Sequence, residues 1–154
     1  MSDADQHSGG CQCGAVRYRT TGAPAKTAVC HCRYCQLRTG SAFGVSVYFP
    51  EDAVTLEQGT LTDYAFQTES GRTFTTRFCP RCGTSVLWTI GLFPGMIGVA
   101  GGTFDPPSFW YDVKREVFTR SKAPFVELCI ADSSETSSAY APIGPDPAHR
   151  NGAR

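Results

Sequence analysis

Hydrophobic and polar residues alternate along most of this chain, which is the pattern of half-buried β-strands. The clearest segment is 42–49, where Phe43, Val45, Val47 and Phe49 fall on one face of an extended backbone. Shorter segments with a similar pattern predict further strands at 15–20, 54–56, 61–67, 72–78, 85–89, 96–100 and 116–119. The pattern therefore predicts a mainly β protein.

Glycine and proline separate these segments. The chain has 16 glycines and 10 prolines spread along its length, which interrupts it too often for long helices. Residues 64–68 and 72–78 flank Glu69, Ser70 and Gly71, and this arrangement predicts a β-hairpin. The pair Pro106 and Pro107 prevents regular structure at that point, although a short turn of helix fits residues 108–111.

The 154 residues suit one domain, because single domains most often have about 100–150 residues. We expect a flexible N-terminus at 1–9, a β domain at 10–132 and a tail at 133–154. The tail is rich in Ser, Thr, Pro and Gly, so it is expected to be loosely packed or disordered.

Charge and hydropathy exclude some partners. Fourteen basic and fourteen acidic side chains cancel, so we expect no nucleic-acid partner. No apolar run approaches the roughly 20 residues that cross a bilayer, so no membrane partner is expected. The first residues have neither a basic start nor an apolar core, which does not fit a signal peptide and favours a cytoplasmic location.

Eight cysteines carry the strongest chemical signal, and seven of them form three clusters. The clusters are Cys11 with Cys13, Cys30 with Cys32 and Cys35, and Cys79 with Cys82; Cys129 stands alone. A cytosolic chain keeps its thiols reduced, so such spacings indicate metal binding rather than disulfides. Cys129 is most simply a small buried apolar residue.

The thiols divide unequally between two candidate metal sites. Both outer pairs are followed by glycine, and together they supply the four thiolates of a closed structural zinc site. The central cluster supplies three, the number typical of a catalytic zinc with one exchangeable position. A rival partition joins Cys32 and Cys35 to Cys79 and Cys82 as a zinc ribbon, leaving the other close thiols without a role.

A zinc ion held by three thiolates carries a net negative charge, so it favours binding and activating a thiol over generating hydroxide. Nearby cations should then hold the substrate, and Arg33 and Arg38 flank the cluster, with Arg72 and Arg77 as second choices. His31 lies between two ligands; we expect it to be a neighbour of the ligands or simply exposed. Three residues are available as a general base, without a spacing that singles one out: Tyr34, Tyr48 and Asp63.

The cysteine motifs, with their flanking residues, resemble the glutathione-dependent formaldehyde-activating enzyme family, which includes centromere protein V. The resemblance covers about 10–128 and rests on segments 10–16, 30–35 with 40–43, 78–84 and 102–105. It implies a β-tent of small antiparallel sheets stapled by zinc, with two Zn²⁺ ions per chain. The implied structural ligands are Cys11, Cys13, Cys79 and Cys82, and the implied catalytic ligands are Cys30, Cys32 and Cys35.

The resemblance also implies a carbon–sulfur lyase-type reaction, in which formaldehyde and glutathione form S-hydroxymethylglutathione or the reverse. Many relatives end a basic stretch on His-Pro-Trp, whereas this chain has Arg120-Ser121-Lys122-Ala123-Pro124-Phe125. The zinc chemistry therefore carries over more directly than the choice of small-molecule thiol. Two alternatives are a non-catalytic zinc-stabilised module with a protein partner, in which His31 could be a fourth ligand, and a redox sensor using Cys32 and Cys35.

Overall fold

The computed structural model describes residues 5–144, and these form a mainly β structure, as predicted. One sheet has three strands, in the order β1 (Gln6–Gly10), β2 (Arg17–Thr21) and β5 (Val54–Gln58). The other has eight, in the order β11 (Asp132–Ser133), β10 (Arg115–Val117), β3 (Lys26–Cys30), β4 (Gly44–Pro50), β9 (Met96–Ala100), β8 (Ser85–Ile90), β7 (Thr73–Phe78) and β6 (Thr62–Gln67). Most neighbours are antiparallel, but β10 runs parallel to β3 and to β11.

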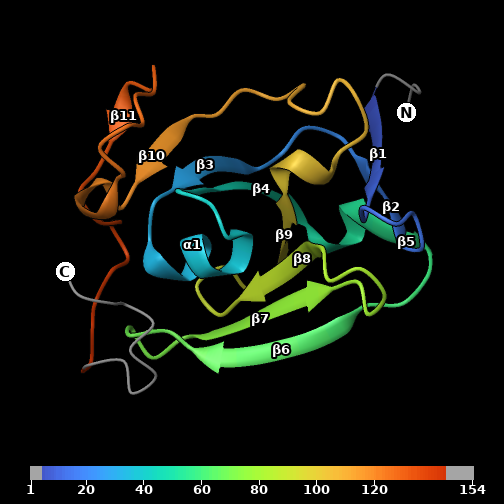
Figure 1. The fold of residues 1–154 in the computed structure, drawn as a ribbon, viewed down its shortest axis with the longest axis horizontal. Helices are drawn as coiled ribbons and strands as arrows, with labels where there is room; N and C mark the ends of the chain where they lie inside the picture. Colours follow the sequence, from blue (N-terminus) through green and yellow to red (C-terminus); the bar gives the residue numbers. More distant parts are fainter. Residues whose placement is uncertain (1–4, 145–154) are drawn as a thin grey trace.

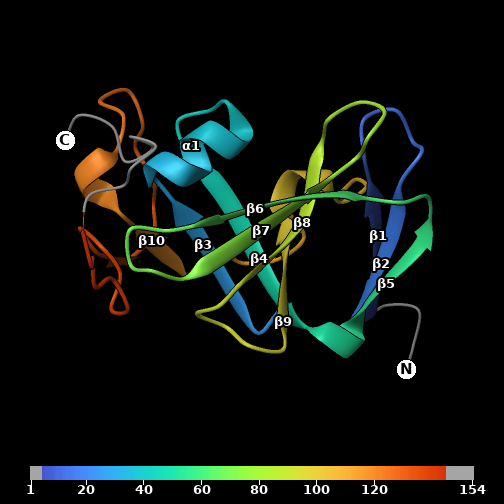
Figure 2. The ribbon, with the colours of Figure 1, turned by 90° about the horizontal axis from the view of Figure 1, so that it is seen from below.

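The eight-stranded sheet bends around the helix α1 (Arg33–Thr39). In Figure 1, β3 and β4 lie on one side of α1, and β8, β7 and β6 lie on the other. Figure 2 shows the same arrangement from below, with the three-stranded sheet at the far end of the molecule from β10 and α1. Residues of β3, β4, β7 and β8 on this sheet line a cavity.

The hydrophobic core lies between the two sheets. Val16 and Tyr18 on the side of the smaller sheet pack with Val47, Phe49 and other buried residues of the larger one. Val47 and Phe49 are fully buried, which confirms the face predicted for this strand. The predicted hairpin is also confirmed, because β6 and β7 pair antiparallel across Thr62 to Phe78 and Gly71 adopts φ 75° between them.

Some elements were not predicted. Strand β1 falls in the segment expected to be flexible, and it pairs with β2 along its whole length. Strand β3 precedes the thiol cluster, and α1 follows it. The short 3₁₀ helices are η2 (Glu51–Ala53), η3 (Gly101–Thr103) and η4 (Thr119–Ser121), so the turn of helix proposed for 108–111 is wrong. Within residues 5–144 the structure has no helix with the length and apolar content needed to span a bilayer.

Residues 134–144, which we call the C-terminal strap, lie against the rest of the protein. Backbone N–H groups of Phe118 and Thr119 donate to strap carbonyls at 3.3 and 3.1 Å, and the N–H of Ile143 donates to the carbonyl of Glu69 at 2.8 Å. Residues 133–144 of the tail expected at 133–154 are exposed or half-buried, and residues 145–154 lie outside the described part of the chain. Residues 1–4 of the expected flexible N-terminus lie outside it as well.

Candidate metal centres and cavity

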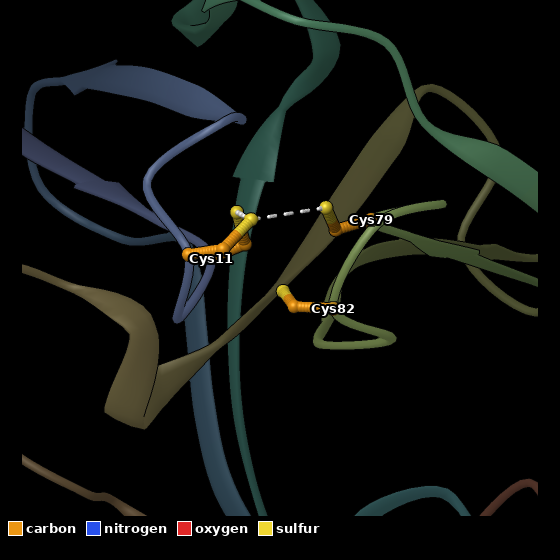
Figure 3. Close-up of side chains that lie close together, drawn as sticks. Cys11, Cys79 and Cys82 are labelled. Atoms are coloured by element: carbon orange, nitrogen blue, oxygen red, sulfur yellow. Dashed lines mark hydrogen bonds between the residues drawn. The ribbon is translucent and has the colours of Figure 1, made fainter.

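Four cysteines meet where the two sheets join. Cys11 and Cys13 lie between β1 and β2, while Cys79 and Cys82 lie between β7 and β8, and all four sulfur atoms are within 4.8 Å of one another. Figure 3 shows Cys11, Cys79 and Cys82 with their sulfur atoms directed toward a common centre. The Sγ of Cys13 is 3.6 Å from that of Cys11 and 3.8 Å from that of Cys79. Zinc bound to four thiolates at about 2.3 Å separates the sulfurs by about 3.8 Å, so this donor set fits zinc.

Two similar turns build this group, which we call the cysteine tetrad. The N–H of Cys11 donates to the carbonyl of Val16 at 3.1 Å, and the N–H of Cys79 donates to the carbonyl of Thr84 at 3.0 Å. Each turn closes on a glycine with φ 78°, Gly14 in the first and Gly83 in the second. Glycine is favoured there because other residues adopt this backbone conformation only at a cost.

Hydrogen bonds reach three of the four sulfurs of the tetrad from outside the group. The N–H of Val16 donates to the Sγ of Cys11 at 3.2 Å, and the N–H of Arg81 donates to that of Cys79 at 3.4 Å. A hydrogen bond between the side chains of Thr84 and Cys82 lowers the pKa of Cys82 to about 5. Against a backbone hydrogen bond at Ala15, burial and hydrogen bonds with the other sulfurs raise the pKa of Cys13 to about 11. Thiolates are the form that binds metal, so Cys82 is the member of the tetrad closest to that form.

The second group contains Cys30, Cys32 and Cys35, whose sulfur atoms also lie within 4.8 Å of one another. Cys30 ends β3, Cys32 is the residue that caps α1, and Cys35 lies in the first turn of the helix. The N–H of Cys35 donates to the Sγ of Cys32 at 3.4 Å. The structure thus separates the seven clustered cysteines into groups of four and three as predicted, and the zinc-ribbon partition is wrong.

The guanidinium of the half-buried Arg38 lies beside Cys35. The Cζ of Arg38 is 4.0 Å from the centre of the Trp88 ring, and within residues 5–144 its Nε and Nη2 have no hydrogen-bond partner. Hydrogen bonds from Cys30 and Cys32, together with the charge of Arg38, lower the pKa of Cys35 despite its burial. A methyl group on Gly44 would lie 2.6 Å from Nη2 of Arg38, so glycine at this position gives the guanidinium its space.

His31 lies on the other side of the backbone and is fully buried, so the expectation that it is exposed is wrong. Its Nε2 is 2.8 Å from Oε1 of Glu116, and the Nζ of Lys122 is 2.7 Å from the same oxygen. The hydrogen bond from Lys122, and then that from His31, lowers the pKa of Glu116 against the effect of burial. His31 is absent from the group of three sulfurs, so the fourth ligand proposed for a non-catalytic module is not His31.

The three-thiol group lies in the wall of a cavity of about 490 Å³. This volume falls within the range of about 300–1,000 Å³ that is common for small-molecule sites. Of the predicted arginines, Arg38, Arg72 and the exposed Arg33 line the cavity, whereas Arg77 does not and instead pairs with Asp63 at 3.3 Å. The structure adds two arginines that the sequence did not single out, Arg115 and Arg120.

Two of the three candidate general bases line the same cavity. Tyr48 accepts a hydrogen bond from Nε1 of Trp88 at 3.0 Å, and burial raises its pKa. Tyr34 accepts one from the N–H of Glu69 at 2.7 Å. Asp63 lies outside the cavity lining, and Cys129 is exposed rather than buried as expected.

Comparison with known proteins adds an independent finding. The family model described as glutathione-dependent formaldehyde-activating enzyme matches residues 6–121 of this chain. A crystal structure of a Rhodobacter sphaeroides protein is similar to this fold with a TM-score of 0.53 and 23% sequence identity. The similarity covers 69% of this chain and 96% of the other, and at this identity it bears on the fold alone.

Proposed function

This chain belongs to the glutathione-dependent formaldehyde-activating enzyme family, and from this premise we propose that it is a zinc-dependent carbon–sulfur lyase-type enzyme. Its reaction is the reversible addition of the glutathione thiol to formaldehyde, which gives S-hydroxymethylglutathione. The observation that carries the proposal is the group Cys30, Cys32 and Cys35, which lines a cavity together with the half-buried Arg38.

Each cysteine group has a distinct role in this proposal. Cys11, Cys13, Cys79 and Cys82 hold a structural zinc, because four thiolates complete a tetrahedron. Cys30, Cys32 and Cys35 hold the catalytic zinc, which supplies stabilisation of the substrate sulfur as a thiolate at neutral pH. The position of these three side chains in the cavity wall leaves the open side toward the substrate.

The reaction requires one bond to form and one proton to be delivered. The glutathione thiolate attacks the formaldehyde carbon, so a carbon–sulfur bond forms while the carbonyl π electrons move to oxygen. The proton lost from the thiol is balanced by a proton gained at that oxygen. Tyr48 suits the donor role because it lines the cavity and its oxygen accepts from Trp88, which leaves its own O–H group to donate.

Cavity arginines suit the anionic groups of glutathione. Arg38 is the first candidate, because its Nε and Nη2 are buried in the cavity wall, where a charge-assisted hydrogen bond to an anion is strong. Arg33 is more exposed and lines the same cavity, so it can contribute a second, weaker contact. Placing Arg38 beside the thiols also offsets the negative charge that accumulates when the substrate thiolate binds.

The test uses zinc-loaded protein and measures, by NMR exchange experiments, the rate at which ¹³C-formaldehyde is converted into its glutathione adduct. The wild-type protein should accelerate the reaction above the spontaneous rate. Arg38→Met should reduce kcat/KM by at least about tenfold, because a charge-assisted bond is worth about 1.5–3 kcal/mol.

Arg77→Met is the matched control, because Arg77 lies on β7 outside the cavity lining. It should retain kcat/KM within about twofold of the wild-type value, since an exposed ion pair contributes little. A wild-type rate equal to the spontaneous rate would overturn the proposed function. Equal losses in the two arginine variants would overturn the role of Arg38.

A further inference from the structure

The C-terminal strap, residues 134–144, begins beyond the segment that the family model matches. Four of its residues, Ser137 to Tyr140, nevertheless line the cavity that contains the three-thiol group. The strap therefore contributes to the substrate site although nothing in the family match assigns it a role. It comes from a different part of the chain than the thiols, which lie in β3 and α1.

Two cavity arginines tie the strap in place. The Nη1 of Arg72 donates to the carbonyl of Ala139 at 2.8 Å, and the Nη2 of Arg120 donates to the hydroxyl of Tyr140 at 3.1 Å. The guanidinium of Arg120 also lies 4.7 Å from the centre of the Tyr140 ring. Each hydrogen bond to the strap uses a single nitrogen, whereas a guanidinium has five N–H donors.

The loop between β6 and β7 completes this arrangement. Glu69 is buried, and its carboxylate is 3.4 Å from the Nη2 of Arg120. Its carbonyl accepts from the N–H of Ile143, and the N–H of Ala141 donates to the side chain of Ser70 at 3.1 Å. These contacts restrict Arg120 to a position in the cavity wall, and a restricted guanidinium binds an anion at a lower entropic cost.

We propose that Arg120 binds a carboxylate of the thiol substrate and that Tyr140 is its positioning residue, so that the strap determines which thiols are accepted. This inference rests on the proposed function and deepens it. A cavity of about 490 Å³ is much larger than a sulfur atom with a one-carbon adduct requires, so it has room for the body of a peptide thiol. The class selected is therefore a peptide-sized thiol with a carboxylate, rather than a small neutral thiol.

The test compares glutathione with 2-mercaptoethanol as the thiol partner of formaldehyde, using zinc-loaded full-length protein. Tyr140→Ala should raise KM for glutathione about tenfold with kcat within about twofold, because it frees Arg120 without touching the thiols. Tyr140→Phe retains the ring against Arg120 and should raise KM only about threefold. With 2-mercaptoethanol, both variants should match the wild type.

Tyr64→Ala is the matched control, because Tyr64 is an exposed tyrosine on β6 outside the cavity lining. It should behave as the wild type with both thiols. A loss in Tyr140→Ala that is equal for the two thiols would indicate a purely structural role and overturn the proposal. Wild-type KM values in Tyr140→Ala would also overturn it.

A binding measurement separates this proposal from the proposed function. If the wild-type protein accelerates neither reaction, the proposed function fails, and binding of S-methylglutathione is then measured by calorimetry. An affinity about tenfold weaker in Tyr140→Ala than in the wild type would support the role of the strap. Equal affinity in both proteins, or no binding to the wild type, would overturn it.

Discussion

Replacing Cys35 by serine is expected to lower the zinc content from two ions per chain to one and to reduce kcat/KM by more than about a hundredfold. Cys35 is buried in the three-thiol group, and its sulfur lies within 4.8 Å of those of Cys30 and Cys32. Loss of a residue that only hydrogen-bonds to a metal ligand already lowers metal affinity or activity by about 10–100-fold. Loss of the ligand itself should therefore lower both by more. Zinc per chain by mass spectrometry and the rate of adduct formation measure the two effects.

Cys129→Ser provides the matched control, because Cys129 is exposed and belongs to neither cysteine group. It should retain both zinc ions and wild-type kcat/KM. If Cys35→Ser instead retains two zinc ions and full activity, the three-thiol group is not the catalytic centre. A comparable loss in Cys129→Ser would show that the effect is not specific to the group.

Replacing Cys13 by serine is expected to affect stability rather than the reaction step. Cys13 is exposed, so the substitution removes a sulfur ligand with little change in packing. The tetrad connects the three-stranded and eight-stranded sheets, and the binding energy of a structural zinc contributes to folding. We expect the midpoint of thermal unfolding, measured by circular dichroism, to fall by more than about 10 °C, corresponding to several kcal/mol.

The same experiment distinguishes the two metal sites. Cys35→Ser should lower the unfolding midpoint less than Cys13→Ser does, because the three-thiol group connects only β3 to the adjacent α1. Cys129→Ser should unfold within about 2 °C of the wild type. An unfolding midpoint for Cys13→Ser that equals the wild-type value would contradict a structural role for the tetrad.

The sequence predicted the parts of the molecule that depend on local pattern. Alternating residues such as Val45, Val47 and Phe49 identified a central strand, because a strand with one face on the core has an apolar residue at every second position. The spacing and number of the cysteines predicted how they separate into two groups. Ligand number depends on the metal rather than on the fold, which is why this prediction needed no structure.

Other features depend on contacts between distant residues and had no local signal. The helix α1 begins at Cys32, whose sulfur takes the place of the usual Ser, Thr, Asp or Asn side chain at a helix start. The position of the Arg38 guanidinium depends on its packing on Trp88, which is far away in the sequence. The hydrogen bonds of Arg120 to Glu69 and Tyr140 likewise join residues that are far apart in the sequence.

The central claim is that the zinc at Cys30, Cys32 and Cys35 has a position that a substrate sulfur can occupy. Its most direct test is the absorption spectrum of the cobalt-substituted protein, in which bands that arise from sulfur bound to cobalt report each added thiolate. Adding glutathione should increase these bands in the wild type and leave them unchanged in Cys35→Ser. An unchanged wild-type spectrum at saturating glutathione, or the same increase in both proteins, would contradict the claim.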